Sequence, residues 1–210
     1  MAKSDTILFA TAVSFEREAA LANVAYKQLS SKLCPFLAQI ANSQIYLAEL
    51  GIGLVNASTH LALLINELTP KKIIFVGLGG ALTEDLTIGD VVCAESVFQH
   101  DSFRSRSDGT KFFIKPGISS LQKESHTDPK LYLDKELNEQ ILDSLSRWTQ
   151  KKLSKGVFAS GSEFVCDIGR KKLLTQTDHN PVIVDMESAG IAKVAQNFAV
   201  PCAIIRIVSD

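Results

Sequence analysis

The chain has 210 residues, of which 46% are hydrophobic and 21% are charged, with a formal net charge of -1 at pH 7. This balance excludes an intrinsically disordered chain, and the length leaves little room for a second full domain, so residues 1–210 are predicted to form one domain. Lys and Arg are scattered along the chain, which argues against nucleic-acid binding and favours a small-molecule ligand.

Short apolar runs rich in β-branched residues recur along the chain and predict buried strands. In chain order they are Ile7 to Val13, Ile45 to Leu50, Lys72 to Val76, Asp90 to Val97, Gly156 to Ala159, Val182 to Val184 and Cys202 to Val208. Apolar residues at three- and four-residue spacing predict helices over Leu54 to Leu68, Lys135 to Trp148 and Glu187 to Phe198. Strands that alternate with helices indicate an α/β fold.

The segment from Phe103 to Pro129 has little periodicity and many Ser, Gly and Pro residues. We therefore expect a long loop or excursion that contacts a partner or covers a site.

The cysteines indicate buried thiols in the reducing cytoplasm, because they form no CxxC pair and lie near no histidine cluster. They are Cys34, Cys93, Cys166 and Cys202. The same absence argues against a metal site. The apolar run from Ile7 to Val13 is too short for an export signal or a membrane span, so we expect no membrane partner.

Glycines stand where strands are expected to give way to helices, and ligands bind at such places in open α/β sheets. Gly51-Ile52-Gly53-Leu54-Val55-Asn56 lacks the third glycine of a dinucleotide fingerprint, so a tight turn that opens a helix is favoured over a ligand contact. Gly77-Leu78-Gly79-Gly80 is not a P-loop. Gly79 and Gly80 either bring backbone N–H groups close to a ligand or serve close packing alone.

Carboxylates follow three of the predicted strands. Glu187 is either stabilised by a helix N-terminus or accepts both hydrogens of a ribose diol. Asp210 is either part of a helix-capping pair with Ser209 or an acid with a raised pKa. A helix capped by Ser14 is the simplest interpretation of the segment after the first strand, but it explains Ser14 better than Glu16.

As a set, these motifs resemble the nucleoside phosphorylase superfamily, and within it the bacterial 5'-methylthioadenosine/S-adenosylhomocysteine nucleosidases. The resemblance runs through Ala12 to Glu16, Gly51-Ile52-Gly53, the glycine turn at Gly77 to Gly80, Ile88-Gly89-Asp90-Val91-Val92, His100-Asp101, Ser160-Gly161 with Phe164-Val165, Asp185-Met186-Glu187-Ser188-Ala189, and Val200-Pro201 before Ser209-Asp210. The Met-Glu and terminal Ser-Asp elements, separated by one helix and one strand, are the most specific.

The resemblance implies a three-layer αβα sandwich around a mixed, partly barrel-like sheet, assembled as a homodimer. It implies a cytoplasmic enzyme of methionine salvage that hydrolyses the N-ribosidic bond of adenine nucleosides and needs no cofactor or metal. Family members continue with a further helix after the Ser-Asp pair, so the domain over residues 1–210 is expected to lack its final helix.

The resemblance also implies a role for each site residue. Asp210, positioned by Ser209, would protonate N7 of the departing base, and Glu16 would deprotonate the attacking water. Glu187 would hold the ribose hydroxyls, with Met186 against the sugar. The purine would stack on Phe164 and be read by the backbone of Val165, and it would lie beside Gly79 and Gly80. An acid on one side and a water-activating carboxylate on the other is coherent chemistry for breaking a glycosidic bond.

Three alternatives remain open at this point. The first alternative concerns the substrate. These nucleosidases usually carry serine at the position of Leu78 and other residues at the positions of Ser162-Glu163, before the aromatic. The substrate is therefore open, and a futalosine-type nucleoside is one candidate. A phosphate-dependent phosphorylase would need arginines to hold phosphate, and the segment from Ala10 to Glu18 offers only Arg17. A nucleoside-binding protein without activity is the alternative outside enzymes.

Overall fold

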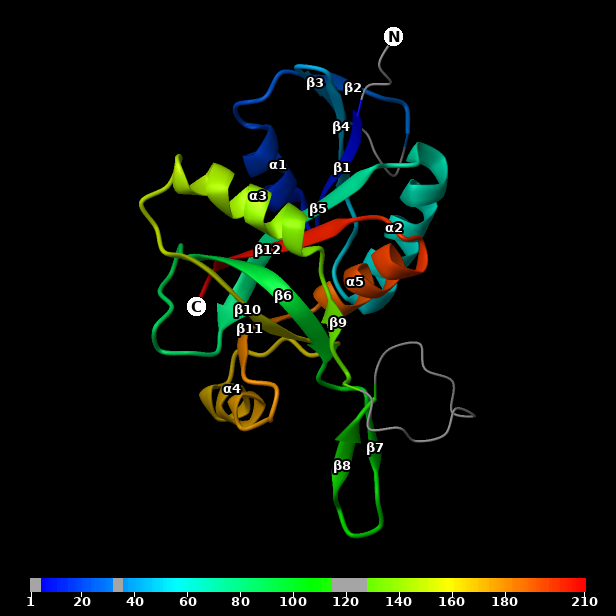
Figure 1. The fold of residues 1–210 in the computed structure, drawn as a ribbon. Coiled ribbons are helices and arrows are strands. Elements are labelled where there is room, and N and C mark those ends of the chain that lie inside the picture. Colours follow the sequence, from blue (N-terminus) through cyan, green and yellow to red (C-terminus); the bar gives the residue numbers. More distant parts are fainter. Residues whose placement is uncertain (1–4, 32–35, 115–127) are drawn as a thin grey trace.

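A ten-stranded sheet forms the centre of the computed structural model, which describes residues 5–31, 36–114 and 128–210 (Figure 1). Its strands are β1 (Asp5–Thr11), β2 (Tyr26–Gln28), β3 (Phe36–Ile40), β4 (Ser43–Glu49), β5 (Lys72–Ala81), β6 (Val91–Gln99), β9 (Leu131–Tyr132), β10 (Leu153–Ser160), β11 (Pro181–Asp185) and β12 (Cys202–Val208). Two more strands, β7 (Phe103–Ser105) and β8 (Lys111–Phe113), form a separate hairpin.

Five of these strands close into a ring. The order β11-β10-β6-β12-β5 is completed by an antiparallel pairing of β11 with β5, where Ile183 faces Ala81 and Val184 faces Gly80. On the other side of β5 the sheet continues as an open, twisted extension through β1, β4, β3 and β2. The sheet is therefore part barrel and part open, and β5 belongs to both parts.

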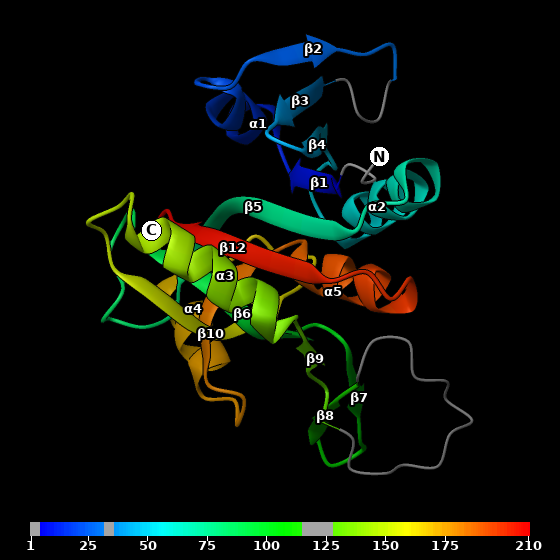
Figure 2. The ribbon, with the colours of Figure 1, turned by 45° about the horizontal axis from the view of Figure 1, so that its top comes forward.

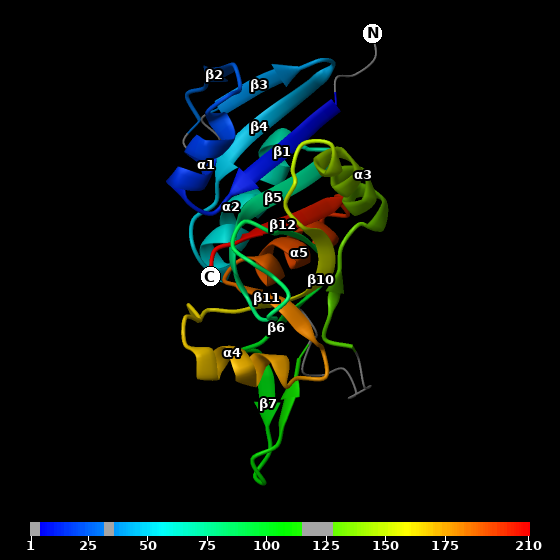
Figure 3. The same ribbon diagram turned by 90° about the vertical axis from the view of Figure 1, so that its left-hand side faces the viewer.

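Helices cover both faces of this sheet. They are α1 (Ser14–Leu21), α2 (Leu54–Leu68), α3 (Lys135–Ser146), α4 (Ile168–Thr175) and α5 (Ser188–Asn197). Helix α3 packs on one side of β6, β10 and β12, and α5 packs on the other side of the same strands (Figure 2). Helix α2 packs against α5. Helices α1 and α4 lie toward opposite ends of the molecule (Figure 3). The predicted three-layer sandwich around a mixed, partly barrel-like sheet is confirmed.

The predicted strands and helices are present with small changes in their bounds. Of the two alternatives predicted over Phe103 to Pro129, a long loop is wrong for the first part, because β7 and β8 pair there as a separate hairpin. Lys111 and Arg106 lie over the rings of Phe103 and Phe112, so the hairpin is held by local cation-π contacts that a search for core periodicity does not detect. Residues 115–127 lie outside the described part of the chain.

The cysteine prediction holds for Cys93 and Cys202, which are buried free thiols, but not for Cys166, which is exposed. Cys166 lies in the connection between β10 and α4, which packs less deeply than the strands. Cys34 is outside the described residues. No helix of the described segments is long and apolar enough to cross a membrane.

Gly156 makes the close approach of β10 and β11 possible, and this gives a testable prediction. A Cβ atom added to Gly156 would lie 2.3 Å from Cγ2 of Val182. We expect Gly156→Ala to lower the free energy of unfolding by about 1–3 kcal/mol, as overpacking does. Chemical denaturation measures this. In the double variant, Val182→Ala should restore part of the lost free energy of unfolding, because it removes the atom that clashes. If Val182→Ala restores none of it, the proposed clash is contradicted.

Candidate active site

The carboxyl ends of three neighbouring strands form the candidate site. Strand β5 lies between β1 and β12 and runs parallel to both. Its last residues contact a side chain or backbone from each neighbour: Leu78 N–H donates to Glu16 Oε1 (2.8 Å), and the carbonyl of Gly79 accepts from the backbone N–H of Ser209 (3.0 Å). A Cβ on Gly80 would lie 3.3 Å from Asp210 Oδ1. Strand β5 thus sets the spacing of the site.

Glu16 caps the first turn of α1 with its carboxylate. Its Oε2 accepts from the backbone N–H of Ala12 (3.0 Å) and Val13 (3.2 Å), while Oε1 reaches across to β5. Ser14 is the first helical residue rather than the cap, so the predicted capping role of Ser14 is wrong. The third helical position suits an acidic side chain, which turns back to the free N–H groups at the helix start. These contacts hold the carboxylate in one place.

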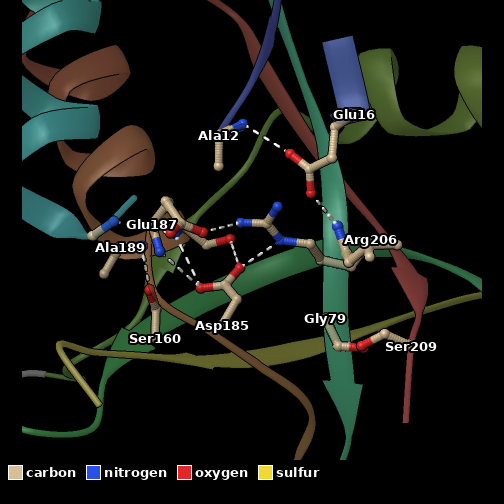
Figure 4. A network of polar contacts seen from close by, with 12 residues as sticks. Ala12, Glu16, Gly79, Ser160, Asp185, Glu187, Ala189, Arg206 and Ser209 are labelled. Carbon is tan, nitrogen blue, oxygen red and sulfur yellow. Dashed lines mark hydrogen bonds and ion pairs between the residues drawn. The ribbon is translucent and has the colours of Figure 1, made fainter. Parts of the chain in front are cut away.

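Arg206 lies at the centre of the site, fully buried between carboxylates (Figure 4). Its Nε donates to Asp185 Oδ2 at 2.7 Å, and Nη2 donates to Glu187 Oε2 at 2.9 Å. Burial would raise the pKa of Asp185, but the Arg206 charge and hydrogen bonds from Ser188 and Ser160 outweigh it and hold that pKa below its ordinary value. Arg206 and Asp185 therefore form a buried ion pair.

The third nitrogen of the guanidinium, Nη1, is buried without a hydrogen-bond partner in the described chain. It lies beside Gly77, where an added Cβ would be 2.1 Å from Nη1 and 2.8 Å from Glu16 Oε1. Any side chain at this position would displace both groups. A glycine is thus required to let a cation and a carboxylate face the same space.

Glu187 joins this network to a second helix. Its Oε1 accepts from the backbone N–H of Gly53 (3.0 Å), the N-cap of α2, whereas the side chain makes no capping bond to its own helix, α5. Burial raises the pKa of Glu187, and the nearby carboxylates of Asp185 and Glu16 add to this, although Arg206 opposes it. The helix N-terminus that contacts Glu187 is therefore that of α2. Gly51 and Gly53, with φ of 84° and 88°, form the predicted tight turn.

Asp210 lies at the outer edge of the site. Its Oδ1 accepts a hydrogen bond from the Ser209 hydroxyl at 2.8 Å, and its Oδ2 accepts one from Nζ of Lys171, on α4, at 2.5 Å. Its backbone carbonyl accepts a hydrogen bond from Ala81 N–H at 2.9 Å. Burial pushes the pKa of Asp210 upward, but the hydrogen bonds from Lys171 and Ser209 outweigh it, so the pKa is lowered. The expected raised pKa of this acid is wrong for the chain without ligand, because Lys171 stabilises the carboxylate.

The remaining predicted residues lie around this centre. Gly79 and Gly80 belong to β5 itself, so the expected glycine turn is wrong and a strand extends through it. Met186 is half-buried between Asp185 and Glu187. Val165 packs with Leu82 and Val184 in a small core cluster, and its neighbour Phe164 is 79% exposed.

The sequence reasoning assigned no site role to Arg206, Asp185 or Lys171. One signal was available for Arg206, because an arginine inside the apolar run from Ala203 to Val208 must be paired if the strand is buried. Lys171 carries no such signal, since it stands in a basic stretch that resembles a solvated helix face.

Clusters of His, Cys, Asp and Glu suited to holding a metal are absent from the described ranges. Two cavities of the described chain lie away from these residues, one of about 290 Å³ between α5 and β9 and one of about 550 Å³ beside α1. The candidate site is therefore identified by its polar groups and not by a deep pocket.

The chain is similar to known proteins in sequence and in fold. The family model of the phosphorylase superfamily matches residues 6–210. A 5'-methylthioadenosine/S-adenosylhomocysteine nucleosidase of Shewanella piezotolerans is 32% identical over 173 residues, which cover 82% of this chain and 70% of that protein.

Two solved structures from Helicobacter pylori have the same fold. One is the futalosine hydrolase, with a TM-score of 0.81 and 26% identity, covering 99% of this chain and 85% of that one. The other is a mutant of the MTAN protein with 5'-methylthioadenosine in the active site, with a TM-score of 0.79 and 26% identity, covering 98% and 85%.

The buried ion pair predicts a pH-dependent contribution to stability. We expect Asp185→Asn to lower the free energy of unfolding by about 3–5 kcal/mol at neutral pH, because it leaves Arg206 without one of its buried partners. The native pKa of Asp185 is lowered, so this contribution is present above the ordinary carboxyl pKa of about 3.9 and is lost as the pH falls through the native value.

Denaturant titrations at neutral and acidic pH measure the difference between the two proteins, which should shrink at acidic pH. Asp143→Asn is the matched control, because Asp143 pairs with Arg147 at the surface, and it should change stability by less than about 1 kcal/mol. Equal losses in the two variants would contradict the interpretation.

Proposed function

Because this chain belongs to the phosphorylase superfamily, we propose that it hydrolyses the N-ribosidic bond of adenine nucleosides of the 5'-methylthioadenosine/S-adenosylhomocysteine type. The observation that carries the proposal is the unpaired Nη1 of Arg206, which faces the same space as the Glu16 carboxylate. A donor and an acceptor placed in this way can hold one water molecule and orient a lone pair of its oxygen.

In the proposed reaction, water held by Glu16 and Arg206 attacks the anomeric carbon of the ribose. Glu16 takes the proton that the water loses. Asp210, oriented by Ser209, hydrogen-bonds N7 of the purine and protonates it as the bond to the sugar breaks. Positive charge that builds up on the sugar is stabilised by the surrounding carboxylates.

Glu187 suits the binding of the ribose hydroxyls. Each of its oxygens already accepts one hydrogen bond, from Gly53 N–H and from Arg206, and each retains a free lone pair. Met186, beside it, packs against the sugar. The exposed ring of Phe164 offers a face for the purine, and we assign the Val165 backbone, Gly79 and Gly80 to the same subsite.

Hydrolysis is favoured over phosphorolysis by the state of the arginines. Arg17 pairs with Glu49 at 2.5 Å and lies over the ring of Phe36, and Arg206 is neutralised by two carboxylates. A phosphate dianion would meet Glu16 and Glu187 without a free cation from either arginine, which is unfavourable.

A futalosine-type nucleoside is the second candidate substrate. Leu78, with 41% of its surface exposed at the site, presents a methyl-bearing side chain where the related nucleosidases usually carry a hydroxyl, and one structural neighbour is a futalosine hydrolase. The backbone N–H of Leu78 donates to Glu16, and we assign the exposed side chain to the choice of the sugar substituent rather than to the reaction.

We also propose a cytoplasmic homodimer that acts in methionine salvage, within one domain over residues 1–210. The exposed apolar side chains of Ile52 and Val55, 55% and 79% exposed, lie at the start of α2 next to the site and support a subunit contact there. The free thiols of Cys93 and Cys202 are consistent with a reducing compartment. Light scattering on the purified protein measures the mass of the assembly.

Release of free base in buffers with and without phosphate tests the proposed reaction. We expect adenine to be released from 5'-methylthioadenosine at the same rate in both buffers, because water is the nucleophile. The same assay with S-adenosylhomocysteine and a futalosine-type nucleoside ranks the substrates. Strict dependence on phosphate would contradict hydrolysis, and binding without release in any buffer would leave a nucleoside-binding protein.

Removing the carboxylate that activates water should abolish most of the activity. We expect Glu16→Gln to lower kcat by about 10²–10⁴-fold, the usual contribution of a general base, while the dissociation constant of a nucleoside changes little. Glu18→Gln is the matched control, because Glu18 lies on the same helix with its side chain 70% exposed. A Glu16→Gln enzyme as active as the Glu18→Gln enzyme would contradict the assigned role.

A further inference from the structure

Lys171 is the residue whose contact the proposed reaction leaves unexplained. It projects from α4, its side chain is 17% exposed, and its Nζ lies 2.5 Å from Asp210 Oδ2. Ser209 occupies the other oxygen of the same carboxylate. Both oxygens of the proposed acid therefore accept hydrogen bonds, and the acid is held in its ionised form, which has no proton to give.

Among the described residues, no other ionisable side chain makes a hydrogen bond or ion pair with Asp210. Strand β5 contributes the backbone of Gly79, Gly80 and Ala81, and β12 contributes the hydroxyl of Ser209. Glu163, which precedes α4, pairs with Arg170 of α4, and Asp167 caps the same helix. Within the described chain, Lys171 is the one charged side chain in contact with Asp210.

We propose that Lys171 supplies the proton that Asp210 passes to the departing purine. This inference rests on the proposed function and adds a residue that acts through Asp210 without touching the base. A purine seated against Asp210 removes water from the ion pair, and loss of water disfavours both charges, which moves the proton from the ammonium toward the carboxylate. The purine becomes strongly basic as it gains the electrons of the breaking bond, so it draws the proton onward.

The step balances in atoms and charge. The Lys171 ammonium first gives a proton to the Asp210 carboxylate. The bond between C1' and N9 then breaks, and its electron pair goes to the purine. N7 of the purine takes the proton from the Asp210 carboxyl group. The water oxygen bonds to C1' and gives its proton to Glu16. Afterwards Glu16 releases a proton to solvent and Lys171 takes one up, so that nucleoside and water become free base and free sugar with no net change in protons.

The structure allows a sharp test, because lysine and arginine differ in what they can release. A lysine ammonium can give up its proton, whereas a guanidinium keeps its proton under all conditions in which an enzyme works. The experiment measures kcat from about pH 6 to about pH 9 with a nucleoside that the wild type cleaves, for wild type, Lys171→Met, Lys171→Arg and Lys172→Met. Lys172 is the matched control, since it is exposed on the same helix.

We expect the wild type and Lys172→Met to keep a nearly constant kcat over this range. In Lys171→Met, Asp210 must take its proton from solvent, so kcat should fall about tenfold per pH unit and be lower by about 10²–10⁴-fold at the alkaline end. Lys171→Arg should fall in the same way, although its charge is retained. Thermal melting and KM should remain close to the wild type in each variant.

Two results would overturn the inference while leaving the proposed function intact. Rescue by Lys171→Arg to within about threefold of wild type would show that a charge suffices. A Lys171→Met profile parallel to that of the wild type, or lying above it, would show a structural or inhibitory role. A wild type that cleaves no purine nucleoside at any pH would overturn the proposed function together with the inference.

Discussion

The buried arginine on β12 is the constraint on which the rest of the site depends. Arg206 has no exposed surface, and an unpaired charge in such a place would cost several kcal/mol. Asp185 and Glu187 offset that cost, so the folded core requires that the end of β11, the start of α5 and strand β12 lie together. The same contacts place Glu187 against the N-terminus of α2.

Rigid strands then set the distance between the two groups proposed to act on opposite sides of the bond. Glu16 contacts Leu78 and Asp210 approaches Gly80, two residues further along β5. At about 3.3 Å per residue the two contacts lie about 7 Å apart. One strand therefore positions both carboxylates, one near Leu78 and the other near Gly80.

The sequence predicts the strands and helices well where apolar periodicity is strong, as for α2 and β12, whose bounds it gives without error. It fails where structure rests on contacts between distant residues or on local ring contacts. The barrel closure of β11 on β5 and the hairpin of β7 and β8 leave no periodic pattern. Among the candidate site residues, the positions of Glu16, Glu187 and Asp210 after strands left a structural role open, and the family resemblance assigned them to one site. Lys171 was missed because only the three-dimensional fold brings α4 to the end of the chain.

A perturbed pKa alone would select a different acid from the one proposed for this site. The pKa of Glu187 is raised and that of Asp210 is lowered, so a ranking by pKa would name Glu187 as the proton donor. The oxygens of Glu187, however, accept hydrogen bonds from the N–H groups of Gly53 and Arg206. A proton on either oxygen would point at one of these donors, which is unfavourable. Glu187 is therefore an acceptor by geometry, suited to hydroxyl groups. Asp210, at the open edge beside a lysine, is the carboxylate from which a proton can leave toward a base.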